Sequence, residues 1–117
     1  MNQIIIIGRL TADPELKLIP STGKYVATFS VAVDRRFQKQ TDFFNVVVWE
    51  KLAENCSNYL RKGSQCAVVG EMQQRSYENN EGKKVYIWEV KAEQVQFLSK
   101  PAEASGYKEI LDEDVNF

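Results

Sequence analysis

The chain has 117 residues, of which 44% are apolar and 26% charged, which is the composition of one globular domain. It contains two cysteines and no histidine, so most metal centres and catalytic triads are excluded, and we expect a protein that is not an enzyme and uses no cofactor or metal. Because no apolar run approaches a membrane span and no leader is recognisable, we expect a cytoplasmic protein without membrane contact.

Charge is distributed unevenly along the chain. Residues 1–100 carry fourteen Lys and Arg against eleven Asp and Glu, whereas residues 101–117 carry one lysine against five acids. This pattern predicts a polyanion-binding domain over 1–100 and a separate interaction tail over 101–117. On charge alone, an ordinary charge-mixed surface with a frayed terminus is the favoured alternative.

The first third of the chain contains three candidate strands. The apolar run at residues 4–7, ended by Gly8, predicts a strand that is either buried on both faces or paired at an oligomer contact. Pro14 interrupts the chain, and a strand can resume at residues 16–19. Residues 26–33 alternate in hydrophobicity and predict a half-buried strand.

The loop at residues 34–40 contains Phe37 among the cations Arg35, Arg36 and Lys39. A lone aromatic at a hairpin tip has no core to reach, so we expect Phe37 to stack on a nucleic-acid base while the cations lie near phosphates. The alternative is a Phe37 that folds back onto its own hairpin.

Residues 41–49 form the strand around which the remaining elements are organised. Its two faces alternate, with Phe44, Val46 and Val48 on one side and Phe43, Asn45, Val47 and Trp49 on the other. Taken alone, the segment fits a strand buried on both sides equally well. The helix and strand that follow are expected to cover one face, which leaves Phe43 and Trp49 on an open surface suited to stacking.

The sequence of the second half of the chain predicts one helix and two or three strands. Residues 50–62 carry an apolar helical stripe that includes Cys56, followed by Gly63 as a helix terminator. A strand is expected at residues 66–69, broken at Gly70 and continued over 72–77. The last strand is expected over 85–98, after a polar loop. We interpret both cysteines, Cys56 and Cys66, as buried thiols.

This order of elements predicts an all-β domain with one helix. Three strands, a helix and two or three further strands are typical of the OB-fold, a five-stranded antiparallel Greek-key barrel that binds oligonucleotides or oligosaccharides on one face. Residues 41–49 would be the third strand, on that face. Its rise of about 3.3 Å per residue separates Phe43 from Trp49 by roughly 20 Å.

Six ordered segments carry a resemblance to a known family. They are IIIIGRLTADPEL at 4–16, VATFSVAV at 26–33, DFFNVVVW at 42–49, AENCSNYLRKGS at 53–64, GEMQQRSY at 70–77 and EVKAEQVQFL at 89–98. Through them the chain resembles the bacterial and phage single-stranded DNA-binding proteins over nearly its whole length. The resemblance implies an OB-fold, usually a homotetramer, that binds single-stranded DNA without sequence preference or cofactor, in replication, recombination and repair.

The resemblance also implies roles for individual residues. By position, Phe43, Trp49 and Tyr77 match the base-stacking aromatics of the family, and Phe37 approximately matches another. The cations that we expect to lie near the DNA backbone are Arg9, Arg35, Arg36, Lys39, Lys51 and Arg75. Trp88 does not occupy a typical stacking position, so the resemblance assigns it no role.

The last six residues resemble the acidic tip by which the family docks onto replication and repair proteins. They are Asp112, Glu113, Asp114, Val115, Asn116 and Phe117, with Asn116 where the family usually has proline. We expect the tail to be disordered in the free protein and to compete with DNA for the basic face.

Two functions from different classes follow. The leading one is sequence-independent binding of single-stranded DNA by a cytoplasmic, nucleoid-associated protein. The alternative is an OB-fold adaptor, such as a primosomal accessory subunit, whose aromatics contact proteins. A DNA-processing enzyme is not expected, because no clustered acidic metal site is recognisable.

Overall fold

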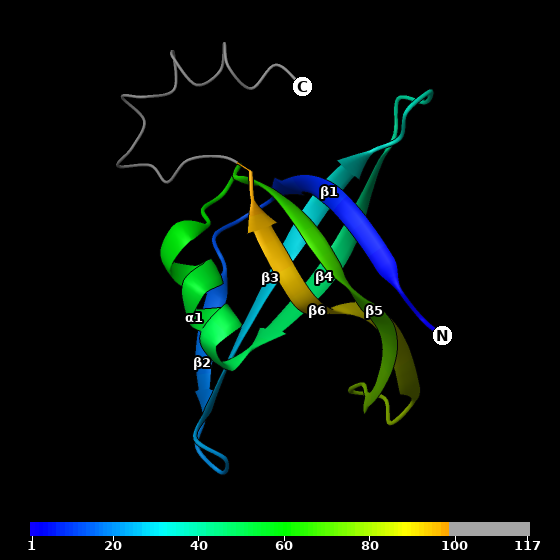
Figure 1. Ribbon diagram of the computed structural model, residues 1–117. Coiled ribbons are helices and arrows are strands. Elements are labelled where there is room, and N and C mark those ends of the chain that lie inside the picture. The colour runs from blue at the N-terminus through cyan, green and yellow to red at the C-terminus, as the bar shows by residue number, and fades with distance from the viewer. Residues whose placement is uncertain (99–117) are drawn as a thin grey trace.

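A computed structural model describes residues 1–98, which form six strands and one helix (Figure 1). The elements are β1 (Ile4–Leu10), β2 (Glu15–Ile19), β3 (Lys24–Asp34), β4 (Thr41–Trp49), α1 (Glu50–Tyr59), β5 (Gln65–Glu78) and β6 (Lys84–Phe97). The proposed tail at residues 101–117, with its acidic tip, lies outside the described residues.

The strands form a single sheet that closes on itself. Its order is β1-β5-β6-β4-β3-β2, and an additional pairing of β1 with β3 completes a ring of five strands. Among the strands described, β2 pairs only with β3. The predicted all-β domain with one helix is therefore confirmed, and the closed sheet is consistent with an OB-fold. Two details differ from prediction. Four strands precede the helix, so residues 41–49 are the fourth, and β4 pairs with β6 in parallel through Val46 and Val90.

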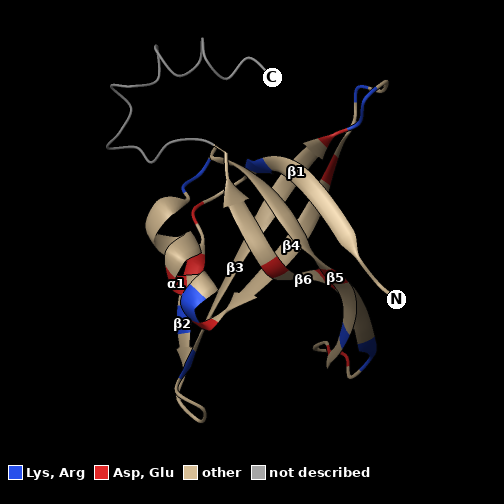
Figure 2. Cartoon of the chain, viewed as in Figure 1, with Lys and Arg blue, Asp and Glu red and all other residues tan. Residues whose placement is uncertain are grey.

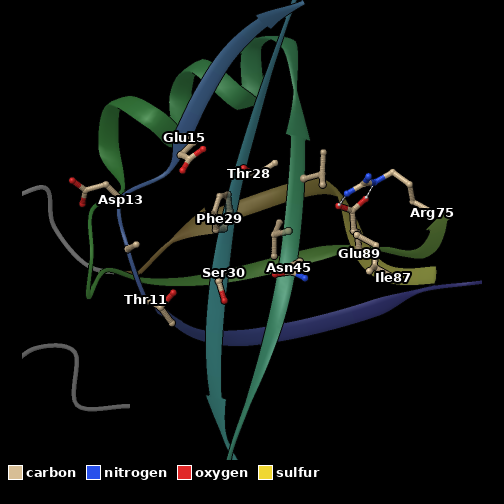
Figure 3. Close-up of a pocket in the computed structure, with 13 residues that line it drawn as sticks. Thr11, Asp13, Glu15, Thr28, Phe29, Ser30, Asn45, Arg75, Ile87 and Glu89 are labelled. Carbon is tan, nitrogen blue, oxygen red and sulfur yellow. Dashed lines mark hydrogen bonds and ion pairs between the residues drawn. The ribbon is translucent and has the colours of Figure 1, made fainter. Parts of the chain in front are cut away.

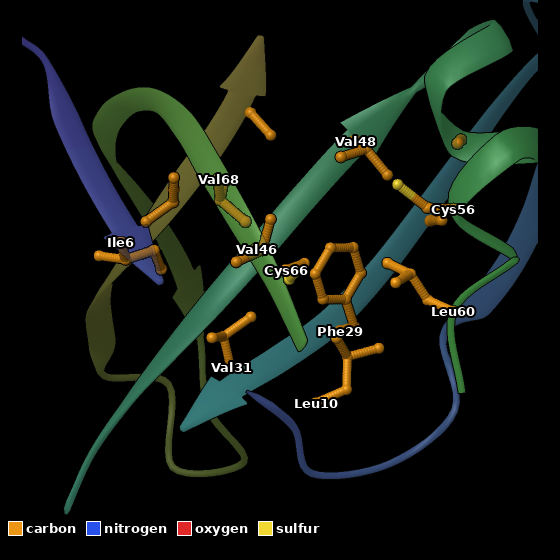
Figure 4. Packing of buried hydrophobic residues seen from close by; sticks show 14 residues of the cluster. Ile6, Leu10, Phe29, Val31, Val46, Val48, Cys56, Leu60, Cys66 and Val68 are labelled. Carbon is orange, nitrogen blue, oxygen red and sulfur yellow. The ribbon is translucent and has the colours of Figure 1, made fainter. Parts of the chain in front are cut away.

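The core contains one face of every strand in the ring. Val46 and Val48 of β4 are fully buried, as the alternation of residues 41–49 predicts, while their neighbours on the strand are not. They pack in a cluster with side chains from the other strands and from the helix (Figure 4). This cluster consists of Ile6, Leu10, Ala27, Phe29, Val31, Val46, Val48, Ala53, Cys56, Leu60, Cys66, Val68, Val90 and Ala92.

Strand β1 is not the fully buried strand that was one of the two alternatives for residues 4–7. Ile6 is buried, but Ile5 and Ile7 are 62% and 60% exposed, so in the single chain this strand is not buried on both faces. The strand also continues through Gly8 to Leu10. A Cβ atom on Gly8 would clash with the carbonyl oxygen of Ala32, so the close approach of β1 to β3 requires glycine at this position.

The helix is shorter than predicted and ends at Tyr59. Leu60 turns to an extended conformation, which buries its side chain in the core. The following backbone bonds to the end of β1 and the loop after it, because Lys62 N donates to Asp13 Oδ1 (2.8 Å) and Gly63 N donates to the Leu10 carbonyl (2.8 Å). These distant partners, which the local pattern does not reveal, end the helix before Arg61 and Lys62.

The break predicted at Gly70 is a bulge within a continuous strand. The pairing of β5 with β6 shifts by one residue between Val69 and Gly70, and a Cβ atom on Gly70 would clash with the carbonyl oxygen of Lys91. Beyond the bulge, β5 and β6 leave the barrel together as a two-stranded ribbon (Figure 1). We call residues 73–78 with 84–89 the β5–β6 ribbon.

Both cysteines are buried in the core, as predicted, and neither forms a disulfide. Burial raises the pKa of the Cys56 thiol to about 12 and that of Cys66 to about 11, because a thiolate is poorly solvated among apolar side chains. Proximity to Cys66 contributes to the increase at Cys56. Both side chains therefore act as small apolar groups.

The alternation of β4 predicts very different effects on stability for aspartate substitutions at two adjacent positions. Val46→Asp places an unpaired charge in a site without solvent and should abolish cooperative folding, because burying a charge costs several kcal/mol. Asn45→Asp, on the exposed face, should change the free energy of unfolding by less than about 0.5 kcal/mol. Urea unfolding followed by circular dichroism measures both. A Val46→Asp protein with a normal transition midpoint would show that this face of β4 is not the core.

Candidate nucleic-acid interface

Residues of β3 to β6, of the segment that joins β1 to β2 and of the β2–β3 hairpin line a continuous groove, which consists of three adjoining hollows. The first, of about 390 Å³, is shown in Figure 3 and shares Val47, Arg75 and Glu89 with a second of about 290 Å³. The second shares Trp49 and Lys91 with a third of about 450 Å³. The shared residues make the three hollows one open channel, which we call the groove.

Trp49 lies where the second and third hollows meet. It is the last residue of β4, is paired with Val26, and is 38% exposed. The next residue, Glu50, has a φ of +57°, in the left-handed region that a non-glycine residue rarely adopts. This turn sends the chain directly into α1, so the indole is held between the end of a strand and the start of a helix. Lys51 is exposed on the first turn of that helix but does not line the hollows described.

The other predicted stacking aromatics lie further along the same outward surface. Phe43 is 65% exposed and lies on the same face of β4 as Trp49, six residues earlier. Tyr77 is exposed on the β5–β6 ribbon. It lies on the same face as Arg75, because the two residues are two positions apart on the strand. Neither lines the three hollows, so these hollows bring together Trp49 and Arg75 but not the full predicted set.

Phe37 lies at the tip of the hairpin between β3 and β4 and is 90% exposed. Its ring is not folded back onto the hairpin strands. Instead, the Arg36 guanidinium carbon lies 5.3 Å from the ring centroid, within the range of a cation–π contact. Lys39 is also exposed, and Figure 2 shows basic residues at this hairpin and, mixed with acidic ones, at the end of β5 and β6.

Three of the predicted DNA-contacting arginines are paired with carboxylates. Arg75 donates from Nε and Nη2 to Glu89 (3.2 and 3.1 Å), and Arg35 donates to both oxygens of Asp42 (each 3.0 Å). Arg9 lies 3.7 Å from a carboxylate oxygen of Asp34. Hydrogen bonding to Arg35 lowers the pKa of the Asp42 carboxyl, and hydrogen bonding to Glu89 raises the pKa of Arg75. A phosphate would therefore compete with a carboxylate for each of these arginines.

Several groove residues were not singled out from the sequence. Lys91 lines two of the hollows and lies two positions after Glu89 on β6. No sequence motif identifies it as a binding residue. Thr28 and Ser30 pair with Val47 and Asn45, so they lie on the groove side of β3. The alternation of β3 would have identified both, had the register with β4 been known. The acids Asp34, Asp42 and Glu89 were missed because ion pairing across strands also depends on register.

Two observations concern sites of other kinds. Among residues 1–98, no three His, Cys, Asp or Glu side chains lie together in a way that could hold a metal ion. The single helix in this part of the chain is too short to cross a membrane.

Comparison with known proteins gives consistent matches. A model of the single-strand binding protein family matches residues 1–98. The chain is 52% identical over 103 residues to the single-stranded DNA-binding protein of Halalkalibacterium halodurans, covering 84% of this chain and 61% of that protein. It is 51% identical over 102 residues to single-stranded DNA-binding protein 3 of Clostridium acetobutylicum, covering 84% and 71%.

A third relative, single-stranded DNA-binding protein 3 of Listeria innocua, is 48% identical over 111 residues, covering 91% of this chain and 69% of its own length. The chain thus spans about three fifths to seven tenths of the length of these relatives. The family model covers the whole closed sheet with its helix and its groove. The chain belongs to the single-strand binding protein family.

Proposed function

We propose that the protein binds single-stranded DNA without sequence preference and performs no catalysis. The observation that carries this proposal is the position of Trp49, which is exposed in the middle of an open groove with Lys24 and Lys91 beside it. An indole stacks on any base because every base has a π-face, and the lysines attract the phosphates on either side. Family membership and the names of the relatives support the same function.

Charge contributes less to this binding than the number of cations suggests. Arg75 is paired with Glu89 in the groove, and Glu50 lines the third hollow together with Lys24 and Lys91. We therefore infer that stacking on Trp49, Phe43 and Tyr77 supplies much of the affinity, and that Phe37 with Arg36 extends the contact to the hairpin tip. Because stacking is insensitive to ionic strength, binding should persist at salt concentrations that abolish a purely electrostatic contact.

We infer that the protein acts in the cytoplasm, on nucleoid DNA, during replication, recombination and repair. In all three processes, such a binding protein would protect exposed single strands. The tip at Asp112, Glu113, Asp114, Val115, Asn116 and Phe117 is proposed to recruit partner proteins. Its acids would pair with basic side chains and Phe117 would enter an apolar pocket.

We also propose that the protein is a homo-oligomer, with a tetramer as the form that the family resemblance implies. Support comes from β1, where Ile5 and Ile7 are exposed. Within residues 1–98, β3 pairs with β1 only at Arg9 and Leu10, so the other backbone edge of residues 4–8 is open. An open edge beside two exposed isoleucines is a surface that a second copy would cover.

Replacing the groove tryptophan tests the main proposal. Trp49→Ala should weaken binding to a dT oligomer by about 1 to 3 kcal/mol, or roughly 5- to 150-fold in Kd, because one stacked base is lost. Trp49→Phe keeps an aromatic ring and should retain most of the affinity. Anisotropy of a labelled oligomer measures Kd, and circular dichroism confirms the fold. A folded Trp49→Ala protein with unchanged affinity would contradict the stacking role, and a wild-type protein that binds no dT would favour the adaptor function.

Neutralising the acid that holds Arg75 tests the role of charge. Glu89→Gln should strengthen binding at low salt, because Arg75 is released to contact a phosphate. It should also steepen the dependence of log K on log salt by about 0.7, the value for one additional phosphate contact on a single strand. Glu93→Gln, on β6 but exposed and outside the groove, removes the same charge as a control. Weaker binding by Glu89→Gln at all salt concentrations would show that Glu89 positions Arg75 for DNA.

Charged side chains on β1 test the oligomer. Ile5→Lys with Ile7→Lys should reduce the molar mass in solution, measured by light scattering or sedimentation, because lysines at an open strand edge oppose pairing with another chain. Leu18→Lys removes an exposed apolar side chain of β2 and should leave the mass unchanged. A wild-type protein that sediments as a monomer at micromolar concentration would refute the proposed assembly.

A further inference from the structure

The β5–β6 ribbon carries a second pair of aromatics that the groove does not use. Tyr86 and Trp88 are 57% and 56% exposed, more than Trp49 itself. They pair across the ribbon with Ser76 and Gln74, whereas Ile87 pairs with Arg75. Because cross-strand partners share a face and neighbours along a strand alternate, Tyr86 and Trp88 lie on the face opposite to that of Arg75 and Tyr77.

The ribbon is accessible from both sides. Strand β1 pairs with β5 no further than Gly70, and β4 pairs with β6 only at Val90 and Lys91. Residues 73–78 and 84–89 therefore pair only with each other among the described strands, and Figure 1 shows them projecting from the barrel. Two strands are only about 5 Å apart, so a polynucleotide on one face of such a ribbon can cross its edge to the other.

The groove leads to this second face. Gln74 lines the hollow that contains Trp49 and Arg75, and it is also the cross-strand partner of Trp88. A strand of DNA that stacks on Trp49 and follows the groove past Arg75 thus reaches the edge of the ribbon beside Trp88. Gln74 thus lies at the edge where the groove and the second aromatic face meet.

The spacing of the two rings suits a base. Side chains two residues apart on a strand are separated by about 7 Å, and stacked bases repeat at about 3.4 Å. One base inserted between the Tyr86 and Trp88 rings would therefore contact both. The amide of Gln74 and the hydroxyl of Ser76 lie opposite these rings, where they can bond to base edges or sugars.

The composition of this face argues against a protein partner as its occupant. Aromatics are common at the centre of a protein interface but charged groups are depleted there, whereas Tyr86 and Trp88 stand among Gln74, Ser76, Glu78 and Lys84. At the ribbon end, the positive charges of Lys83 and Lys84 are balanced by Glu78 and Glu81, so the face has no strong field of its own. Flat rings among polar groups, without excess charge, are suited to stacking bases.

We propose that Trp88 and Tyr86 form a second stacking site for single-stranded DNA, filled by nucleotides that leave the groove and wrap around the β5–β6 ribbon. The proposal rests on the proposed function, because it extends the path of the same ligand. Short oligomers occupy the groove alone, and longer ones also engage the ribbon. The site adds occupied length and affinity without adding salt dependence.

The sequence offers a direct test, because Trp49 and Trp88 are its two tryptophans. In Trp49→Phe, all indole emission comes from Trp88, and in Trp88→Phe it comes from Trp49. Each protein is titrated with dT oligomers between about 4 and about 16 nucleotides long, the range that single OB domains occupy. Anisotropy of labelled DNA reports binding independently. Trp49 emission should be quenched by all oligomers that bind, and Trp88 emission only by the longer ones.

The affinities supply a second readout. Trp88→Ala should lose about tenfold or more in affinity for the longest oligomer, at low and high salt alike, and should bind the shortest as the wild type does. Trp88→Phe should restore most of the loss. Tyr25→Leu, which removes an exposed aromatic from the hairpin of β2 and β3, is the matched control and should bind normally at every length.

Three results would overturn the inference. Trp88 emission that stays constant while anisotropy shows saturated DNA would place the strand elsewhere and leave single-strand binding itself intact. Trp88 emission that follows protein concentration, and not DNA, would assign this face to a second copy of the chain. Failure of the wild-type protein to bind dT would refute the proposed function and this site together.

Discussion

The two-residue period of β4 is the constraint on which the rest of the structure depends. One face of this strand places Val46 and Val48 in the core, and the other places Asn45, Val47 and Trp49 in the groove. β4 also holds the ring together, since it pairs with β3 on one side and with β6 on the other. A shift of one residue in its register would exchange the two faces, so folding and the composition of the binding surface are specified by the same interaction.

This dependence explains which features could be predicted from the sequence. The core face of residues 41–49, the single helix and the buried cysteines follow from local periodicity, and the structure confirms them. The predicted helix end was wrong because the backbone N–H groups of Lys62 and Gly63 bond to Asp13 and Leu10, some 50 residues earlier in the chain. The bulge at Gly70 and the parallel pairing of β4 with β6 are also properties of distant partners. Local patterns specify which side of an element is apolar but not which element it meets.

The candidate site shows the same division. The exposed aromatics Phe43, Trp49 and Tyr77 were identified by alternation and resemblance, and all three are accessible. The arginines were identified by charge, but Arg35 and Arg75 each have a carboxylate partner on a neighbouring strand that charge counting does not reveal. A phosphate that binds either arginine must replace a carboxylate partner, which lowers the net free energy of that contact. Exposed aromatic rings can stack on unpaired bases, whereas the bases of a duplex are already stacked on one another.

The buried cysteines make the domain chemically inert toward thiol reagents. Only the thiolate is a strong nucleophile, and burial raises the pKa of both thiols so far that each is almost entirely protonated at pH 7. Thiol-directed oxidants, alkylating agents and disulfide exchange therefore have no accessible cysteine within residues 1–98 unless the core opens. A change in redox conditions therefore leaves Cys56 and Cys66 unmodified as long as the domain stays folded.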